Sequence, residues 1–375
     1  MTGARHLYVH LPFCAHRCGY CDFVTAVGRL GEHDSYVEAL LAELELEREL
    51  LAPRPETIFL GGGTPTFTRL PALERLLAAL PDADEVTVEA NPETVTPALA
   101  ALLARNRVSR VSLGVQSFQP RLLAVLERAA GPEDARRAVG VLRDAGFANL
   151  SLDLIYGIPG QGVAELEHDL EEAVALAPEH VSAYELEAKP GTRFAHRHGT
   201  ELAAQAETME TYLERVVAVL AAAGYRWYET ASFCRRPDRA GGRDLRARHN
   251  LGYWLGHDYL GLGVGAVSTV GARRWRNEPS LARYVGALRR GRRPPRALEP
   301  LSAGTRAFER VMLGLRLDQP LPVGGIEHVL DPAGLRRVER LGLVRREGGA
   351  LALTDRGRLL GDAVTAELLA PTMER

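Results

Sequence analysis

TIFLGGGTPT, residues 57–66, begins as a β-rich apolar run and stops at three glycines that are followed by a threonine and a proline. A run of this kind predicts a buried strand that ends in a tight loop. The stretch Ala72–Leu80 that follows has the apolar spacing of an amphipathic helix. Because parallel strands need a long crossover between them, a strand, loop and helix in this order are typical of a parallel α/β fold.

The same pattern recurs through most of the first 223 residues. The predicted strands are His6–His10, Thr57–Leu60, Val86–Ala90, Arg110–Val115, Leu150–Tyr156 and His180–Glu185. The predicted helices are Tyr36–Leu50, Ala72–Leu80, Pro97–Arg105, Glu133–Ala145, Glu165–Ala177 and Gln205–Ala223. Six βα units with right-handed crossovers predict a parallel (βα)6 partial barrel, similar to a TIM barrel that does not close.

Composition limits the class of protein. The chain has 375 residues and is 46% hydrophobic, which is enough for one large core and a smaller second domain. Its formal net charge of −2 gives no overall basic field for binding nucleic acid. The first residues lack the apolar segment of a secretory signal, and no uncharged apolar run of about 18 residues is present. We therefore expect a soluble, cytoplasmic protein that does not bind nucleic acid.

The composition changes near residue 232, where Gly, Arg and Pro become frequent. Arg289–Pro300, with the sequence RRGRRPPRALEP, is the best candidate for a linker between domains. Beyond it, the pattern predicts helices over Thr305–Leu315 and Gly334–Leu341 and a hairpin over Leu343–Leu353. We therefore expect a core barrel over 1–231, a barrel extension over 232–300, and a small winged-helix-like α+β domain over 301–375.

Three of the four cysteines, Cys14, Cys18 and Cys21, lie within eight residues in a loop after the first predicted strand. Clustered thiols in a reducing compartment indicate a metal centre and not a disulfide framework. A structural zinc ion takes four ligands, so His10 or His16 would have to complete its set. Three thiolates on a 4Fe-4S cluster instead leave one iron open to a small molecule with an amine and a carboxylate. The spacing favours the cluster but leaves zinc open.

Glycines and carboxylates follow other predicted strands, at the edge where ligands bind in this fold class. Gly61–Gly63 lack Cβ atoms, so a ligand can approach their backbone, and Thr64 adds a hydroxyl. Glu89 and Asp153 each end a strand, where a carboxylate can accept hydrogen bonds from an ammonium group or from ribose hydroxyls. Taken singly, each feature has a plainer explanation, namely a tight turn or a solvated helix cap.

Together these motifs resemble the radical S-adenosylmethionine (SAM) superfamily. Its signature is the CxxxCxxC spacing with an aromatic residue just before the last cysteine, which in this chain is Tyr20. GGGTPT (61–66), EANP (89–92), LGVQSF (113–118) and DLIYGIPGQ (153–161) are similar to motifs of the oxygen-independent coproporphyrinogen III oxidase family and of its haem-chaperone branch, HemW. The similarity covers nearly the whole chain. It implies a 4Fe-4S cluster on the three cysteines, a HemN-like C-terminal domain, and SAM bound at the positions that match the family: Tyr8, Tyr20, Gly62, Gly63, Thr64, Glu89, Gln116, Arg128 and Asp153.

Two features separate the branches of this family. Its oxidases carry a further cysteine two residues beyond the third, where this chain has Phe23. The residues His249, Asn250, Tyr253 and Trp254 match the HNxxYW motif of the haem chaperones. In that motif an imidazole can be an axial iron ligand, and the aromatic rings can pack on a macrocycle. Outside the family context, the histidine would be interpreted as a cap ahead of two core aromatic residues.

Three other features concern the region after residue 231. Val267 stands where the haem-chaperone branch commonly has a histidine, which removes one candidate for a polar contact. Arg273–Arg296 is interpreted as a solvated linker, with binding of haem propionates as the alternative because guanidinium groups pair bidentately with carboxylates. Cys234 lies in an irregular, Arg-rich segment and is interpreted as a buried or surface thiol outside the cluster.

The resemblance implies a protein that carries haem and delivers it to haem-requiring membrane enzymes such as respiratory cytochromes, and we assign no catalytic residue. Such recipients allow peripheral contact with a membrane. The oligomeric state stays open, with a dimer as one option. The alternative function is an oxidase that decarboxylates coproporphyrinogen III to protoporphyrinogen IX, but Phe23 and the HNxxYW motif favour carriage over catalysis. A zinc-dependent or purely structural protein is a third option.

Overall fold

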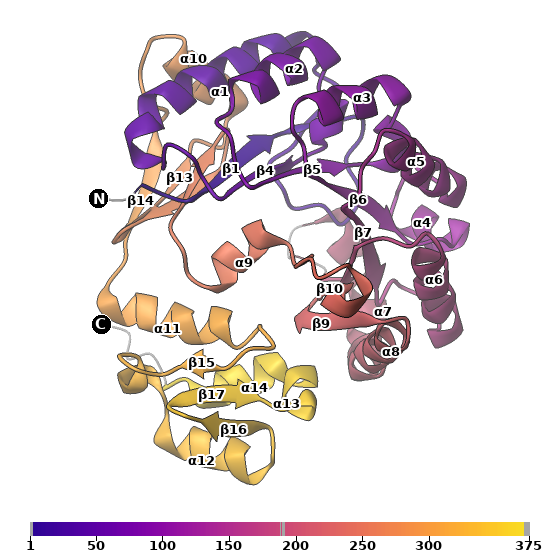
Figure 1. Ribbon diagram of the computed structural model, residues 1–375, viewed down its shortest axis with the longest axis vertical. Coiled ribbons are helices and arrows are strands. Elements are labelled where there is room, and N and C mark those ends of the chain that lie inside the picture. The colour runs from indigo at the N-terminus through magenta and orange to yellow at the C-terminus, as the bar shows by residue number, and fades with distance from the viewer. Residues whose placement is uncertain (1–2, 188, 190–191, 371–375) are drawn as a thin grey trace.

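The computed structural model describes residues 3–187, 189 and 192–370. One twelve-stranded sheet curves into an open arch, and six parallel strands lie side by side in chain order at its centre (Figure 1). These are β1 (His6–Leu11), β4 (Thr57–Gly62), β5 (Glu85–Ala90), β6 (Arg110–Gln116), β7 (Leu150–Tyr156) and β8 (His180–Glu185). The structure confirms the α/β prediction, and each predicted strand is found within two residues of its expected bounds.

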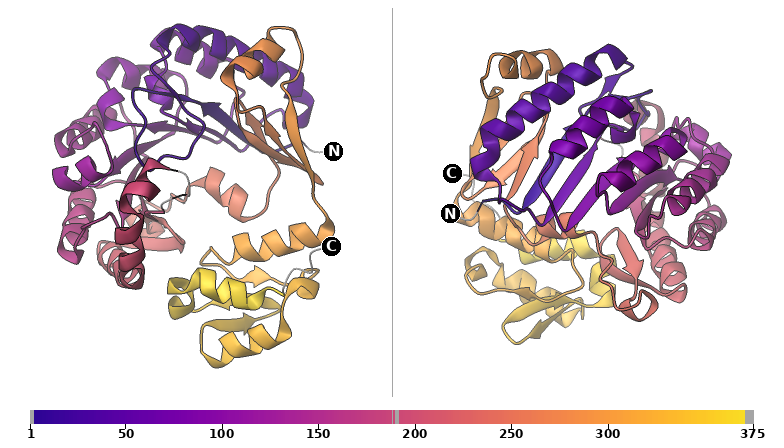
Figure 2. Two further views of the ribbon diagram at one scale, coloured as in Figure 1. Left: turned by 180° about the vertical axis from the view of Figure 1, so that it is seen from behind. Right: turned by 45° about the horizontal axis from the view of Figure 1, so that its top comes forward.

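Helices cover the outer face of the arch (Figure 2). The six predicted helices correspond to α1 (His33–Glu47), α2 (Leu70–Ala79), α3 (Pro97–Arg105), α5 (Pro132–Asp144), α6 (Val163–Ala175) and α8 (Met209–Ala222). Two further helices, α4 (Pro120–Val125) and α7 (Arg193–Gln205), lie in the connections. Local sequence fixes where some of them begin. In α3, for example, Pro97 sets φ at the first position and the Thr96 hydroxyl accepts a hydrogen bond from the Leu99 amide at 3.2 Å.

The sheet has a packed, apolar outer face and a polar inner face. In β1, Leu7 and Val9 belong to the large hydrophobic core, whereas Tyr8 and His10, which alternate with them, line a cavity. Burial of one such leucine stabilises the fold by about 1.5–3 kcal/mol, so this alternation holds the register strongly. The polar side chains are thereby carried on a rigid frame.

Strands that the sequence did not predict extend both edges of the arch. Beside β1 lie β11 (Tyr259–Leu262), which is parallel to it, and then the antiparallel strands β12 (Val267–Val270), β13 (Arg273–Asn277) and β14 (Arg296–Pro300). At the other edge, β10 (Ser232–Arg235) and β9 (Tyr225–Glu229) follow β8. The segment interpreted as a linker therefore contributes an edge strand, and helix α10 (Leu281–Leu288) precedes it.

The arginines of this segment are bound to the protein and not merely solvated. Arg296 forms an ion pair with the buried Glu47 at 2.8 Å and lies over the ring of Trp275 at 5.0 Å. Arg293 pairs with the same carboxylate at 2.6 Å. The expectation of a solvated linker is therefore wrong for these side chains, because a carboxylate from α1 lies beside them.

The C-terminal segment has a hydrophobic cluster of its own around Val311, Leu335 and Leu351. The predicted helices are α11 (Ala303–Gly314) and α12 (Pro332–Arg340), and the predicted hairpin consists of β16 (Val344–Glu347) and β17 (Ala350–Leu353). The short strand β15 (Leu321–Pro322) and the helices α13 (Asp355–Leu359) and α14 (Gly361–Leu368) were not predicted. Ion pairs connect this part to the arch, among them Arg316 with Glu229 at 2.7 Å.

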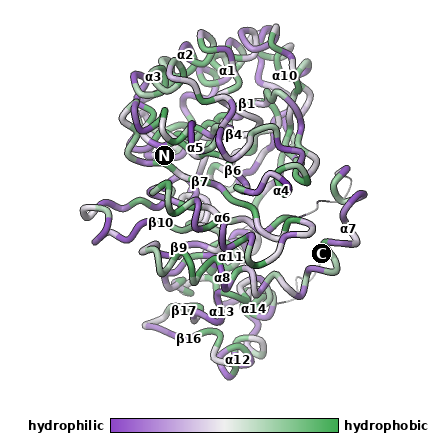
Figure 3. The backbone as a smooth tube through the Cα atoms, turned by 90° about the vertical axis from the view of Figure 1, so that its right-hand side faces the viewer, coloured by the Kyte–Doolittle hydropathy of each residue, from purple (hydrophilic) through white to green (hydrophobic). Residues whose placement is uncertain are grey.

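Helix α9 (Arg248–Trp254) lies inside the open side of the arch, above α11 (Figure 1). The loop that leads to it from β10 projects from the body and is hydrophilic (Figure 3). Cys234, at the base of this loop, is 3% exposed and packs in a small cluster with Tyr228 and Leu245, far in sequence from the other thiols. In the part of the chain that the structure describes, no helix is long and apolar enough to cross a membrane.

Candidate metal and cofactor site

Three thiols lie in one loop at the carboxyl end of β1. Cys14 ends the short strand β2 (Phe13–Cys14), which pairs with β3 (Ala26–Val27) and so closes the loop between them. The Cys21 amide donates a hydrogen bond to the Cys18 carbonyl at 3.2 Å. All three cysteines are free and line one cavity of about 520 Å³, here called the thiol cavity. The loop therefore presents three sulfur atoms to a common space.

Two side chains donate hydrogen bonds to these sulfur atoms. The Thr64 hydroxyl lies 3.6 Å from Cys14 Sγ, and Arg128 Nη1 lies 3.6 Å from Cys18 Sγ. Burial raises the pKa of Cys14 to about 11 and also raises the pKa of Cys21. Because the thiolate is the form that binds metal, the nearby guanidinium and hydroxyl favour the charge state that ligation requires.

The arrangement of donors separates the two metal hypotheses. A single zinc ion takes four ligands, whereas the loop presents three thiols to the cavity. In a 4Fe-4S cluster each thiolate binds a different iron, so the sulfur atoms need not converge. The donor set therefore fits the cluster better than it fits zinc.

Neither candidate for a fourth zinc ligand is presented to the thiols. His10 hydrogen-bonds through Nε2 to the Val24 carbonyl at 2.8 Å and through Nδ1 to the Tyr8 hydroxyl at 3.0 Å. His16 Nε2 hydrogen-bonds to the Glu127 carbonyl at 3.0 Å and lies 3.9 Å from Cys18 Sγ. Both imidazoles thus have roles in holding the thiol loop against neighbouring segments.

The glycines at the carboxyl end of β4 form a cradle beside the thiols. A Cβ atom on Gly63 would lie 2.6 Å from the Pro12 carbonyl and 3.0 Å from Cys14 Sγ. Gly62 has φ of +112° and donates its amide to Glu89 Oε2 at 3.1 Å. Since only glycine fits both the conformation and the space, the backbone comes as close to a ligand in this cavity as the chain allows.

Two buried carboxylates face the same cavity. Burial, followed by the proximity of Asp153, raises the pKa of Glu89 to about 7. Burial also raises the pKa of Asp153, although its oxygens accept hydrogen bonds from Ser112 at 2.9 Å and Ser151 at 3.1 Å. Because burial disfavours the charged forms of both acids, a bound cation such as an ammonium group would stabilise these charged forms.

Arg128 connects the thiol loop, through Cys18, to groups near the carboxyl ends of β5 and β6. Its Nη2 donates to Asn91 Oδ1 at 3.0 Å and to the Gly114 carbonyl at 2.8 Å, while Nε is buried without a partner among the described residues. Gln116 follows a register shift in β6 and has φ of 70°, which is unusual outside glycine. Strained residues of this kind concentrate at functional sites, and this one lines the thiol cavity.

The structure brings together most residues that the sequence singled out for SAM. Eight of the nine line the thiol cavity with the three cysteines, whereas Tyr8 lines a different cavity. Sequence reasoning missed Ser112 and Tyr184, which also line it. A signal for Ser112 was present, because it lies on β6 directly beside Glu89 of β5 and would be expected to face the same edge.

The HNxxYW segment forms α9, and its histidine is enclosed. His249 is 1% exposed, with Nδ1 2.7 Å from the Thr57 hydroxyl and Nε2 2.9 Å from the Tyr253 hydroxyl. Burial lowers the pKa of His249 to about 3, so the ring is neutral near pH 7. Phe59 stacks on it with 5.1 Å between ring centroids. Both ring nitrogens are thus occupied by protein groups.

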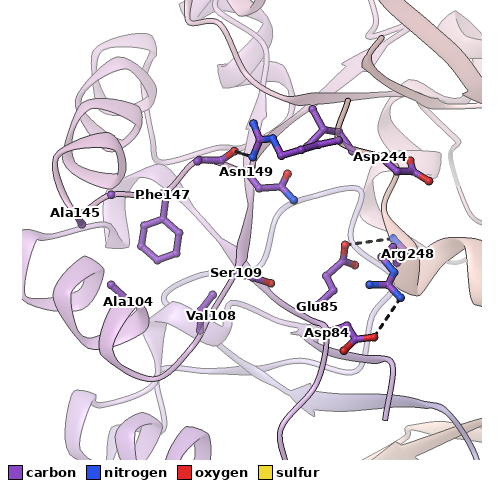
Figure 4. Close-up of a pocket in the computed structure, with 14 residues that line it drawn as sticks. Asp84, Glu85, Ala104, Val108, Ser109, Ala145, Phe147, Asn149, Asp244 and Arg248 are labelled. Carbon is purple, nitrogen blue, oxygen red and sulfur yellow. Dashed lines mark hydrogen bonds and ion pairs between the residues drawn. The ribbon is translucent and has the colours of Figure 1, made fainter. Parts of the chain in front are cut away.

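A charged pocket at the opposite end of the strands fixes the start of α9 (Figure 4). Glu85 accepts hydrogen bonds from the amides of Arg248 at 3.4 Å and His249 at 3.3 Å, and the Arg248 guanidinium pairs with Asp84 at 3.5 Å. A carboxylate at a helix N-terminus is stabilising, so this pocket is explained as the anchor of α9. The aromatic residues at the other end of α9 are positioned by it.

Those aromatic residues face a second open cavity of about 680 Å³, here called the aromatic cavity. Tyr253 and Trp254 line it together with Tyr259 of β11 and Phe23 of the thiol loop. Asn250 lies half-buried on the same helix, outside this lining. The HNxxYW motif therefore splits in space, with an enclosed histidine and two aromatic side chains at a cavity.

Comparisons with known proteins agree with this geometry. The family profile described as Radical SAM superfamily matches residues 8–173, and the profile described as HemN C-terminal domain matches residues 301–360. The chain is 40% identical to the haem chaperone HemW of Mycobacterium tuberculosis, over 97% of this chain and 94% of the relative. It is 32% identical to HemW of Bacillus subtilis, over 96% of this chain and 98% of the relative.

Among solved structures, the chain is similar to coproporphyrinogen III oxidase (HemN) from Escherichia coli. The TM-score is 0.80, with 24% sequence identity over 97% of this chain and 90% of that one. At this level of identity the likeness concerns the fold. It includes both the arch and the C-terminal segment, because nearly the whole of each chain is aligned.

Proposed function

Because this chain belongs to the HemW family of radical SAM proteins, we propose that it is a haem chaperone that binds haem as cargo and carries a 4Fe-4S cluster and SAM. The observation that carries this proposal is the joint presence of three thiols in one cavity and near-full-length similarity to relatives named haem chaperones. A radical SAM domain implies the cluster and SAM. That haem is the cargo is inferred from the relatives, which are named haem chaperones.

In this proposal Cys14, Cys18 and Cys21 each give one thiolate to the cluster. Support comes from their position around one cavity and from the hydrogen bonds that Thr64 and Arg128 donate to two of the sulfurs. When bound, the cluster supplies one iron without a protein ligand, which can take the amine and carboxylate of SAM. The chain's own contribution is to fix the sulfur atoms and to shield them from solvent.

The remaining residues of the thiol cavity bind SAM. Gly62, Gly63 and Thr64 allow it to approach the backbone, and Glu89 and Asp153 accept hydrogen bonds from its ammonium group or ribose hydroxyls. Tyr20, Gln116 and Arg128 complete the lining. Tyr8, which lies outside this cavity, contributes by holding His10 against Val24 of the thiol loop.

Haem binding involves the HNxxYW residues in two ways. Tyr253 and Trp254 offer ring surfaces at the aromatic cavity, where a macrocycle can pack. His249 acts as a positioning residue, because its Nε2 holds the Tyr253 hydroxyl at 2.9 Å and its Nδ1 is anchored on Thr57. Asn250 lies on α9 directly after His249, and we include it among the haem-site residues because it belongs to the motif.

The recipients of the haem are haem-requiring membrane enzymes such as respiratory cytochromes. This part of the proposal follows from the resemblance of the chain to haem chaperones and accords with peripheral contact with a membrane. Delivery needs haem to be released, so the affinity for haem must be lower than that of the recipient. An open cavity meets this requirement better than an enclosed one, since an open cavity buries less of the macrocycle.

An oxygen-independent coproporphyrinogen III oxidase is the competing function. The fold is shared with HemN, so fold does not separate the two activities. Phe23 does bear on the choice, because it stands where the oxidases of the family have a fourth cysteine, and this residue is 61% exposed and lines both cavities. We therefore place haem carriage ahead of porphyrinogen decarboxylation.

The proposal is tested with anaerobically reconstituted protein that has been loaded with haem and mixed with membrane vesicles containing a haem-free respiratory cytochrome. We expect the absorption spectrum of the holo-cytochrome to appear, and its oxidase activity to return. A parallel reaction contains coproporphyrinogen III, SAM, a reductant for the cluster and an acceptor for the electron that the substrate loses. Formation of protoporphyrinogen IX with no haem transfer would replace the chaperone proposal with the oxidase.

A further inference from the structure

A line of hydrogen bonds runs from a half-buried histidine just after α9 to the wall of the aromatic cavity. Nδ1 of His257 lies 3.1 Å from His6 Nε2, and His6 Nδ1 lies 2.8 Å from the Thr57 hydroxyl. The same hydroxyl lies 2.7 Å from His249 Nδ1, and His249 Nε2 lies 2.9 Å from the Tyr253 hydroxyl. Four contacts thus join five side chains in one unbranched series, here called the histidine network.

The backbone around the network keeps its outer end together. A Cβ atom on Gly252 would lie 2.7 Å from His6 Nε2, so glycine at this position lets α9 approach the His6 ring. The His257 amide donates to the Gly252 carbonyl at 2.9 Å, and the His257 ring stacks on His6 with 5.3 Å between centroids. His6 and His249 are 3% and 1% exposed, whereas His257 is half-buried. A proton from solvent therefore enters the network at His257.

The number of protons couples these hydrogen bonds to one another. A neutral imidazole carries one N–H and one bare nitrogen, and a hydroxyl carries one proton. When every contact is a hydrogen bond, Thr57 donates to one of the two Nδ1 atoms beside it and accepts from the other. The same rule holds for each ring, so all four hydrogen bonds point in one direction. Two arrangements are possible, in which Tyr253 either donates to His249 or accepts from it.

The charge of His257 selects between the two arrangements. When His257 is neutral, Tyr253 donates to His249, because a phenol is the stronger acid and an imidazole the stronger base. A protonated His257 carries hydrogen on both nitrogens, so its Nδ1 donates to His6. Each hydrogen bond along the network then reverses, and His249 donates to the Tyr253 oxygen. The hydroxyl proton of Tyr253 is thereby free to turn to the aromatic cavity, which this residue lines.

We infer that the histidine network transmits the protonation of His257 to Tyr253 and so decides whether the Tyr253 hydroxyl donates a hydrogen bond into the aromatic cavity. His257 and His6 are then positioning residues, since they lie outside the lining of the cavity and act through Tyr253. The donor suits a ligand with an acceptor oxygen, such as a carboxylate. These roles require no other property of the ligand, so they are independent of the proposed haem cargo.

The surroundings of the two outer rings determine where the network responds to pH. The charged side chains that face them come from several segments: Arg5, Glu56, Arg248, Asp258 and Arg310. Burial, followed by the effect of nearby arginines, lowers the pKa of His257 below its ordinary value, although the two acids oppose this change. Burial lowers the pKa of His6 to about 4 and that of His249 to about 3. Both inner rings therefore stay neutral in weak acid while His257 becomes charged.

The test is nuclear magnetic resonance of the anaerobically reconstituted full chain, labelled with ¹⁵N-histidine and ¹³C-tyrosine. The pH is lowered from about 8 to about 5. We expect His6 and His249 to exchange their N–H and bare-nitrogen signals at the midpoint of His257, with neither ring becoming charged. The Cζ signal of Tyr253, identified by its loss in Tyr253→Phe, should shift at the same midpoint. Tautomers that stay constant while His257 titrates would overturn the inference and leave the network a merely structural role.

His257→Phe removes the titrating group and retains a ring that stacks on His6. In this variant the tautomers of His6 and His249 should no longer depend on pH. His196→Phe is the matched control, because His196 is an exposed histidine of α7 outside the network, and it should behave like the wild type. A response to pH that persists in His257→Phe would show that the signal does not originate at His257, and the inference would fail.

Substitutions of Thr57 locate the path of the signal. Thr57→Val interrupts the network, so His6 should still respond to His257 whereas His249 and Tyr253 should not. Thr57→Ser keeps the hydroxyl and should restore the response of both. A response of His249 in Thr57→Val, or its loss in Thr57→Ser, would show that coupling does not pass through the hydroxyl and would overturn the inference. Circular dichroism shows whether each variant is folded, and His257→Phe decides the question if Thr57→Val is not.

Discussion

Thr57→Val is expected to destabilise the protein strongly, although it only replaces a hydroxyl by a methyl group. Thr57 is completely buried at the start of β4, and its hydroxyl bridges His6 Nδ1 at 2.8 Å and His249 Nδ1 at 2.7 Å. The hydrogen bonds continue from His6 to His257 at 3.1 Å and from His249 to Tyr253 at 2.9 Å. The hydroxyl is therefore the centre of a buried polar network.

The magnitude follows from what valine leaves behind. A net hydrogen bond contributes about 0.5–1.5 kcal/mol, and a buried polar atom left without a partner costs about 1–3 kcal/mol. Two imidazole nitrogens lose their partner here, so we expect the free energy of unfolding to fall by about 3 kcal/mol. Because valine and threonine are both β-branched, strand propensity and volume change little.

The control is Thr87→Val on the adjacent strand. Thr87 is 1% exposed, and its hydroxyl has no partner among the residues that the structure describes. Removal of this hydroxyl should leave the free energy of unfolding unchanged or raise it by up to about 1 kcal/mol. Both variants are compared with the wild type by urea denaturation, monitored by circular dichroism under anaerobic conditions. Equal effects of the two substitutions would refute the network as the source of stability.

Three other outcomes are expected. Gly63→Ala should lower the cluster content of reconstituted protein severalfold, because its Cβ would overlap the backbone of the thiol loop; unchanged iron and sulfide would contradict this. The affinity for SAM should rise about tenfold between pH 6 and pH 8 as Glu89 ionises with its pKa near 7, and Glu89→Gln should abolish this dependence in calorimetric titrations. Arg316→Ala should lower the free energy of unfolding by about 3 kcal/mol, because it leaves the buried Glu229 without its ion-pair partner. Arg337→Ala, which breaks an exposed ion pair, should lower it by less than about 1 kcal/mol. Similar losses for both variants in urea denaturation would show that burial of the pair is unimportant.

Much of the arch could be predicted because the sequence signals for each strand and helix lie within that segment itself. Each central strand is an apolar run that ends at glycine or a polar residue, and each helix has its own periodicity. The strands β13 and β14 could not be predicted in this way, since RRWRN and RALEP are polar and exposed. They are strands because neighbouring backbone pairs with them, and this pairing depends on contacts distant in sequence.

The same distinction between local and distant contacts applies to the candidate site. The thiol cavity could be predicted because its residues follow successive parallel strands, whose carboxyl ends must meet at one edge. The environment of His249 could not, because Thr57 is 192 residues away and the motif itself gives no hint that both ring nitrogens are occupied. Nor could Met312, which reaches the aromatic cavity only because α11 packs on α9.

The central claim is that the thiol cavity holds a 4Fe-4S cluster with an iron open to SAM. It is tested by electron paramagnetic resonance of the reduced, anaerobically reconstituted protein, together with iron, sulfide and zinc analysis. We expect about four iron and four sulfide per chain, a cluster signal that changes when SAM is added, and loss of the signal in Cys18→Ala. About one zinc per chain with no sulfide, or a cluster signal that does not respond to SAM, would contradict the account.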